Sequence, residues 1–257
     1  MAPDAFFLLT PFYLAAACTI AVLGGFVKGT VGFALPMILI SGLGSFMQPE
    51  IALAALIVPA VVSNVWQAFR NGLDAAVESA RVHWRYLVVL AVCLALSAQL
   101  VTVLSPQVMF LSLGIPVTVF AFLQLVGFRP SIPPRRRRAT EVGVGVVAGG
   151  IGGISGVWGP PTVLYLTALN TPKDEQMRVQ GVVYGFGAIL LGLAHLKSGV
   201  FNTSTAPLSA LLLLPSLLGL AIGFALQDRI DQARFRKLTL LVLVVAGLNL
   251  IRRGVLS

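Results

Sequence analysis

The sequence has 257 residues, of which 57% are hydrophobic and only 11% are charged. Its mean hydropathy of +0.93 excludes an ordinary soluble domain and indicates an integral membrane protein. The apolar runs are continuous, which favours membrane-spanning α-helices over a β-barrel. The net charge of +9 does not indicate a nucleic-acid partner, because the cations cluster between apolar segments, where the positive-inside rule accounts for them.

Ten apolar segments follow one another along the chain. They cover residues 6–27, 33–46, 51–69, 86–104, 107–127, 141–157, 160–169, 181–196, 206–226 and 237–252. Two of them, 33–46 and 160–169, are short. Each follows a glycine-rich stretch and has proline in or near its first turn, where proline favours a new helix over the continuation of the previous one. We therefore predict an all-α polytopic membrane protein with about eight transmembrane helices and two short broken or re-entrant half-helices.

The two broken stretches look like copies of one device, a helix, a glycine-rich break and a second short helix. Three further apolar segments follow each copy, which indicates an internal duplication. We predict a single membrane domain, residues 1–257, with a first repeat at 6–128 and a second at 141–253. A proline-rich basic linker at 129–140 joins them.

The distribution of lysine and arginine predicts how the broken stretches run. If each enters the membrane and returns, 15 of the 18 cations fall on one side, and only Lys197, Arg252 and Arg253 fall on the other. A path in which each broken stretch crosses once divides them far less unevenly. The positive-inside rule therefore predicts cytoplasmic basic loops and both termini outside, with the two halves inverted relative to each other. Inverted repeats with broken helices are typical of secondary transporters, although glycines that merely allow close helix packing are the alternative.

Two stretches carry a family resemblance. "GGFVKGTVGFALPMILISG" with the following "PAVVSNVWQAFRNG", and "GGISGVWGPPTVLYLTALNTPKDEQMRVQGVVYGFGAILL" in the second half, resemble the TauE/SafE family of membrane transporters. The resemblance covers nearly the whole chain. It implies a multi-pass permease of the bacterial inner membrane that exports sulfite, organosulfonates or similar small anions, with no organic cofactor.

The breaks themselves predict an anion site. Where a helix is interrupted, backbone N–H groups lose their partners, and the N-terminus of the next helix carries a partial positive charge. Donors would come from residues 30–33 and 155–159, with glycines letting the backbone approach a ligand. The predicted substrate-binding residues are Lys28, Gly29, Thr30, Gly32, Phe33, Asn64, Gln67, Ser155, Gly156, Trp158, Gly159 and Gln180.

Lys28 is the only basic residue within either glycine-rich stretch. A lysine in a spanning segment is costly, so it is predicted to be the counter-charge of the anion. The alternative is that Lys28 lies at a hairpin end and extends its ammonium to the membrane interface. Asn64, Gln67 and Gln180 are predicted to donate to a bound oxyanion, or alternatively to hydrogen-bond between helices. Trp158, within the second break, is the best candidate among the aromatic residues to line a pathway, and packing is the alternative.

All nine acidic residues fall in loops or at segment ends, so no mid-span carboxylate is expected to couple transport to protons or sodium. No cluster of side chains indicates a metal site or a catalytic centre, and the protein is not predicted to be an enzyme. The predicted function is alternating-access transport of a small sulfur-containing anion around the paired breaks. The alternatives are an anion channel and a transporter of other small organic anions. The expected partners are the anionic substrate and the lipid bilayer, and a homo-oligomer is left open.

Overall fold

The computed structural model describes residues 10–70, 72–128, 131–227 and 229–256. Every regular element within these ranges is helical, which confirms the all-α prediction. The first residues of the predicted segment 6–27 lie outside the described part of the chain.

Each half of the chain begins with a long helix followed by a short one. The first half contains α1 (Pro11–Val31), α2 (Leu35–Leu43), α3 (Pro49–Phe69), α4 (Leu73–Val82), α5 (Trp84–Ser97), η1 (Ala98–Thr102) and α6 (Pro106–Leu125). The second contains η2 (Pro134–Arg136), α7 (Arg137–Ser155), α8 (Gly159–Ala168), α9 (Lys173–Ser198), α10 (Ala206–Leu226) and α11 (Gln232–Leu256). The short helix α4 was not predicted, because its mixed polar and apolar sequence resembles a loop between two spans.

Seven helices of the described chain are long and apolar enough to cross a membrane, where the sequence predicted about eight. The missing one is α7. It has 19 residues, but it starts with arginines, contains Glu141 and is rich in glycine, so its apolar content is low. In α3 and α9, 67% and 61% of the most apolar window is buried, compared with 39% or less in the other five spans. These two helices therefore form the centre of the molecule.

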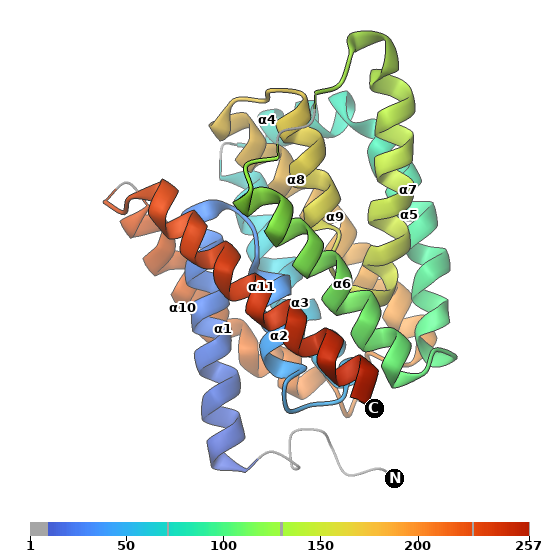
Figure 1. Ribbon diagram of the computed structural model, residues 1–257, viewed down its shortest axis with the longest axis vertical. Helices are drawn as coiled ribbons and strands as arrows, with labels where there is room; N and C mark the ends of the chain where they lie inside the picture. Colours follow the sequence, from blue (N-terminus) through green and yellow to red (C-terminus); the bar gives the residue numbers. More distant parts are fainter. Residues whose placement is uncertain (1–9, 71, 129–130, 228, 257) are drawn as a thin grey trace.

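The chain path shows that each long helix is followed by a reversal (Figure 1). The start of α1 and the end of α11 lie at the lower end of the view, whereas the α6–α7 connection, α4 and the α10–α11 connection lie toward the upper end. Helix α2 runs back beside α1, and α8 packs against α7. The prediction that each broken stretch turns back is confirmed. The side of the membrane that each end faces stays a prediction.

Two helix pairs of the same kind flank the central helices. Helix α1 packs along α10, and α7 packs along α5. A Cβ atom added to Gly25 would lie 2.0 Å from the carbonyl oxygen of Ser216 in α10, and one added to Gly153 would lie 2.4 Å from that of Leu94 in α5. Glycine therefore lets backbone contact backbone in both pairs. An inverted duplication would produce this pairing, and the duplication itself stays a prediction.

Candidate functional site

The first helix break covers three residues, Gly32, Phe33 and Ala34. Gly32 has φ 85° and Ala34 has φ 82°, so the residues on both sides of Phe33 are in the left-handed region. The N–H of Gly32 donates to the carbonyl of Lys28 at 2.8 Å and closes the end of α1. Glycine adopts this conformation freely, but for alanine it costs about 1–2 kcal/mol. The chain reverses here, and α2 starts with Pro36 in its first turn.

The second break has the same form. Gly156 ends α7 with φ 69°, and α8 starts at Gly159, followed by Pro160 and Pro161. The hydroxyl of Ser155 donates to the carbonyl of Ile151 at 2.7 Å and accepts the N–H of Val157 at 3.1 Å. This hydroxyl therefore stabilises the break itself.

The two breaks meet at one enclosed cavity of about 20 Å³. The residues that line it come from α1, α2, α3, α8 and α9 and from the two breaks. They are Lys28, Phe33, Ala34, Pro36, Met37, Asn64, Gly156, Val157, Trp158, Gly159 and Tyr184. Because the first residues of α2 and of α8 are among them, the partial positive charges of two helix N-termini face the same space.

Lys28 is completely buried at this cavity. Its ammonium donates a hydrogen bond to Asn64 Oδ1, and Nζ lies 5.9 Å from the centroid of the Tyr184 ring. The interpretation in which Lys28 extends to the membrane interface is therefore wrong for this structure. No acidic side chain is among the described residues that line the cavity, so the ammonium has no carboxylate partner there.

The three predicted amides occupy different places. Asn64 lines the cavity, and its Nδ2 is buried without a hydrogen-bond partner among the described residues. Gln67 lies behind the first break, where its Nε2 donates to the carbonyls of Gly32 at 3.1 Å and Met177 at 2.9 Å. Gln180 is buried beside Gly32 and lines a neighbouring pocket. Only Asn64 therefore shares a cavity with Lys28.

Two further predicted residues have other partners. A Cβ on Gly29 would lie 2.5 Å from the carbonyl oxygen of Leu220, so Gly29 faces α10 and does not line the cavity. The hydroxyl of Thr30 donates to carbonyls of its own helix, Phe26 at 3.0 Å and Val27 at 2.9 Å. These short-range bonds are common for threonine within a helix.

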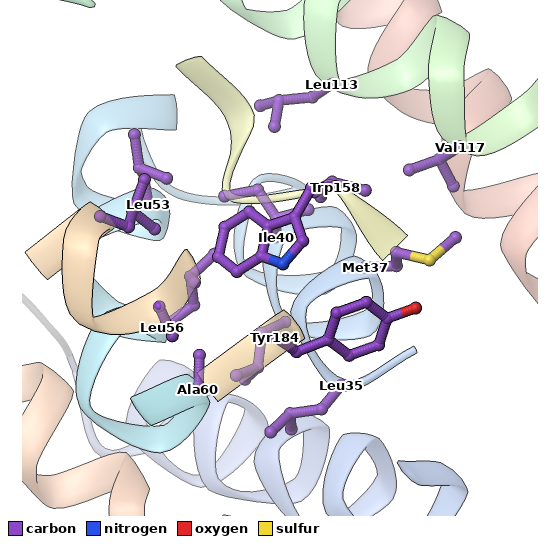
Figure 2. Packing of buried hydrophobic residues seen from close by; sticks show 14 of the residues in the cluster. Leu35, Met37, Ile40, Leu53, Leu56, Ala60, Leu113, Val117, Trp158 and Tyr184 are labelled. Atoms are coloured by element: carbon purple, nitrogen blue, oxygen red, sulfur yellow. The ribbon is translucent and has the colours of Figure 1, made fainter. Parts of the chain in front are cut away.

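Trp158 fills the space between the second break and its neighbours. Positions for a Cβ on Gly152 and Gly187 lie 3.0 Å and 2.8 Å from its indole, so α7 and α9 both need glycine beside it. Figure 2 shows the indole among the aliphatic side chains of Ile40 and Leu56. Trp158 therefore packs as a wedge and also lines the cavity, and its place on a transport pathway stays a prediction.

Sequence reasoning missed Tyr184, which lines the cavity from α9. Its hydroxyl donates to the carbonyl of Gly159 at 3.2 Å and so holds the first residue of α8. Thr162 holds the preceding carbonyl, that of Trp158, at 2.8 Å, and Tyr86 lies 2.7 Å from the Thr162 hydroxyl. Tyr184 follows Gln180 by four residues, so helical spacing could have placed it on the same face.

A second group of polar residues is buried outside the cavity, near the start of α7. It includes Glu141, His83 and Tyr165, whose ring lies edge-on to His83 with centroids 6.0 Å apart. Burial, with a smaller contribution from the charge of Arg137, lowers the pKa of His83 to about 4. Glu141 is near a segment end, as predicted, but its burial was not predicted. No group of three His, Cys, Asp or Glu residues that could hold a metal ion occurs in the described chain.

A comparison with family models matches the chain to the sulfite exporter TauE/SafE model over residues 17–250. The comparisons with curated proteins and with solved structures gave no match.

Proposed function

The chain belongs to the sulfite exporter TauE/SafE family of membrane transporters, and we propose that it carries sulfite or an organosulfonate at the cavity between its two helix breaks. The multi-pass helical structure supports transport across a membrane.

The observation that supports this proposal most strongly is the one-sided chemistry of the cavity. It contains the buried ammonium of Lys28, the starts of α2 and α8, and the unpartnered amide donor of Asn64. Each helix start contributes roughly half a positive charge. With no carboxylate among its described lining residues, such a cavity favours an anion.

The size of the cavity supports a moving site. A cavity of about 20 Å³ holds about one water molecule, which is too little for a sulfur oxyanion. Binding therefore requires the breaks to separate, and a site that opens to one side at a time is the basis of alternating access.

The orientation in the membrane follows from the distribution of arginine and lysine. The basic end of the molecule is the end that carries the α6–α7 connection with the arginines at 135–138, and we expect it to face the cytoplasm of a bacterial inner membrane. A cysteine placed in the 135–138 stretch should then react with an impermeant thiol reagent only from the cytoplasmic side. Labelling from outside would indicate the opposite orientation.

Thermal unfolding with added anions tests the substrate class. Purified protein is heated with sulfite, sulfate, thiosulfate, organosulfonates or carboxylates, and the same series is repeated with Lys28→Gln. Ligand at 100 times its Kd stabilises by about 2.7 kcal/mol, so a binding anion raises the Tm. We expect sulfur oxyanions to stabilise the wild type and to lose that effect in the variant. Stabilisation by carboxylates alone would assign another substrate class.

Counterflow in proteoliposomes tests the carrier mechanism. Labelled sulfite outside should accumulate when unlabelled sulfite is loaded inside, because a carrier exchanges the two through one site. Single-channel currents without counterflow would instead indicate an anion channel.

A further inference from the structure

A second hollow lies at the end of the molecule where α10 and α11 join. Its outer part has a volume of about 580 Å³ and its inner part about 240 Å³. The two parts adjoin, because Gln176, Ala233 and Arg236 line both of them. Lys237 also lines the outer part, and no acidic side chain is among the described residues that line either part. The described lining of the hollow therefore carries two cationic side chains, Arg236 and Lys237.

The inner part of this hollow ends at Phe33. Among the described lining residues, Phe33 is the one that the inner part shares with the Lys28 cavity. Its side chain is 4% exposed and meets Phe120 edge-on, with ring centroids 5.9 Å apart. One aromatic ring thus separates a large basic hollow from the buried ammonium.

The backbone around Phe33 is suited to movement of this ring. Gly32 and Ala34 on either side both have left-handed φ values, and the alanine is strained there. Strained residues occur often at switch regions, where a change of conformation releases the strain. The carbonyl of Gly32 accepts from Gln67 Nε2 at 3.1 Å, and the carbonyl of Ala34 accepts the N–H of Ile38 at 2.9 Å, so both neighbours of Phe33 are hydrogen-bonded in this conformation.

We propose that this hollow is a second anion site on the route between the basic end and Lys28, and that the Phe33 ring is the barrier between the two sites. The identity of the anion rests on the proposed function, whereas the barrier does not.

The chemistry of the hollow fits an oxyanion in transit. The Arg236 guanidinium, which donates to Gln124 Oε1 at 2.8 Å, has the planar fork of N–H donors that matches oxyanion geometry. Lys237 adds a second positive charge near the outer opening. At the inner end the buried Gln180 amide lies against Gly32, and by turning it can present its NH₂ group to an anion that reaches Phe33. The positive charge increases the local anion concentration ahead of the barrier.

Cysteine accessibility tests the barrier without any transport measurement. In a background with Cys18→Ser and Cys93→Ser, Met37→Cys reports on the Lys28 cavity, because Met37 lines it and is 2% exposed. An impermeant anionic thiol reagent is added from the side of the α6–α7 connection. We expect slow labelling that becomes at least tenfold faster with Phe33→Ala, and no such increase from the other side.

Phe46→Ala is the matched control, since Phe46 stacks on Tyr13 and lines neither the hollow nor the cavity. It should leave the labelling rate of Met37→Cys unchanged. Equal rates with and without Phe33→Ala, or faster entry from the opposite side, would overturn the barrier. Gln176→Cys, at the entrance side of Phe33, should react equally fast with and without Phe33→Ala, and an unchanged Tm confirms that the variants are folded.

Substrate protection tests the second site. Isethionate, an organosulfonate that does not react with thiols, should slow the labelling of Gln176→Cys, and Arg236→Gln should weaken this protection at least fivefold. Protection that is unchanged by Arg236→Gln would show that the anion does not bind in this hollow. If no sulfonate protects any position while Phe33→Ala still exposes Met37→Cys, the barrier stands and the proposed sulfur-anion substrate fails.

Discussion

The two helix breaks share a backbone and differ in side chains. Both end a long helix at a glycine with positive φ and start a short helix with proline in its first turn. The residue four positions before the glycine is Lys28 in the first break and Gly152 in the second. The residue two positions after the glycine is Ala34 in the first break and Trp158 in the second. The first break therefore supplies the charge of the site and the second supplies its bulk, which suggests that binding and shape can be altered separately.

Removing the charge from the first break should have the largest effect on transport. We expect Lys28→Met to reduce anion flux in proteoliposomes by at least about 100-fold, because the site loses its counter-charge. The Tm should not fall, since a buried lysine costs roughly 2.5–3.5 kcal/mol on membrane-insertion scales. Lys197→Met, at an exposed lysine, is the control and should retain flux. Normal flux in Lys28→Met would show that the first break does not supply the charge that binds the anion.

Removing the bulk from the second break should act on stability first. Trp158→Ala should lower the free energy of unfolding by about 3–5 kcal/mol, because it leaves a cavity between Gly152 and Gly187. Thermal unfolding followed by circular dichroism measures this loss. Trp66→Ala, at a tryptophan that is 44% exposed, should cost much less. Equal Tm values for the two variants would contradict the role of Trp158 as a wedge.

The second break also has a titratable group behind it, because His83 contacts Tyr165 of α8. With the pKa of His83 lowered to about 4 from 6.5, the unfolded chain binds a proton more readily than the folded one. Stability is therefore complete above pH 6.5 and decreases by up to about 3 kcal/mol as the pH falls toward 4. We expect His83→Gln to lose less Tm between pH 6.5 and 4.5 than the wild type.

Arg81→Gln, at an exposed arginine in α4, serves as the control for the histidine variant and should keep the wild-type pH dependence. If His83→Gln also keeps it, another group is responsible for the loss at low pH.

The smallest effect concerns the strained alanine of the first break. Ala34→Gly should raise stability by about 1 kcal/mol, because glycine adopts its φ of 82° without strain. Gly156→Ala in the second break should do the opposite, since the added Cβ is strained and lies 3.1 Å from Leu53 and Leu56. Chemical denaturation of the pair measures both signs, and a destabilised Ala34→Gly would show that the alanine side chain has a packing role of its own.

The breaks could be predicted from the sequence because glycine and proline act locally. Gly32, Pro36 and Gly156 determine the backbone wherever they occur, so the reversals and short helices followed from the sequence. The sequence placed Lys28 and Asn64 in the same predicted site, but it did not predict the hydrogen bond between them.

Other features needed the tertiary structure. Gly29 was predicted to approach a ligand, but a glycine on a helix cannot show which neighbour it faces, and it faces α10. The hydroxyls of Thr30 and Ser155 bond to their own helices, an alternative that no spacing excludes. The depth of Lys28 depends on the helices that cover it, and α4 was hidden because its polar residues match a loop.

The glycine contact between α1 and α10 has a consequence for biosynthesis. Helix α1 is made before the other described helices, and its partner α10 starts only at Ala206. During synthesis α1 therefore has to reside in the membrane with its glycine face against lipid. Lys28 is then without the neighbours that bury it, and its place one turn from the end of α1 lets the ammonium reach the aqueous boundary meanwhile. The lining of the cavity is complete only once α9, which supplies Tyr184, has been inserted, so a chain that is stalled or truncated before α9 lacks the complete substrate site.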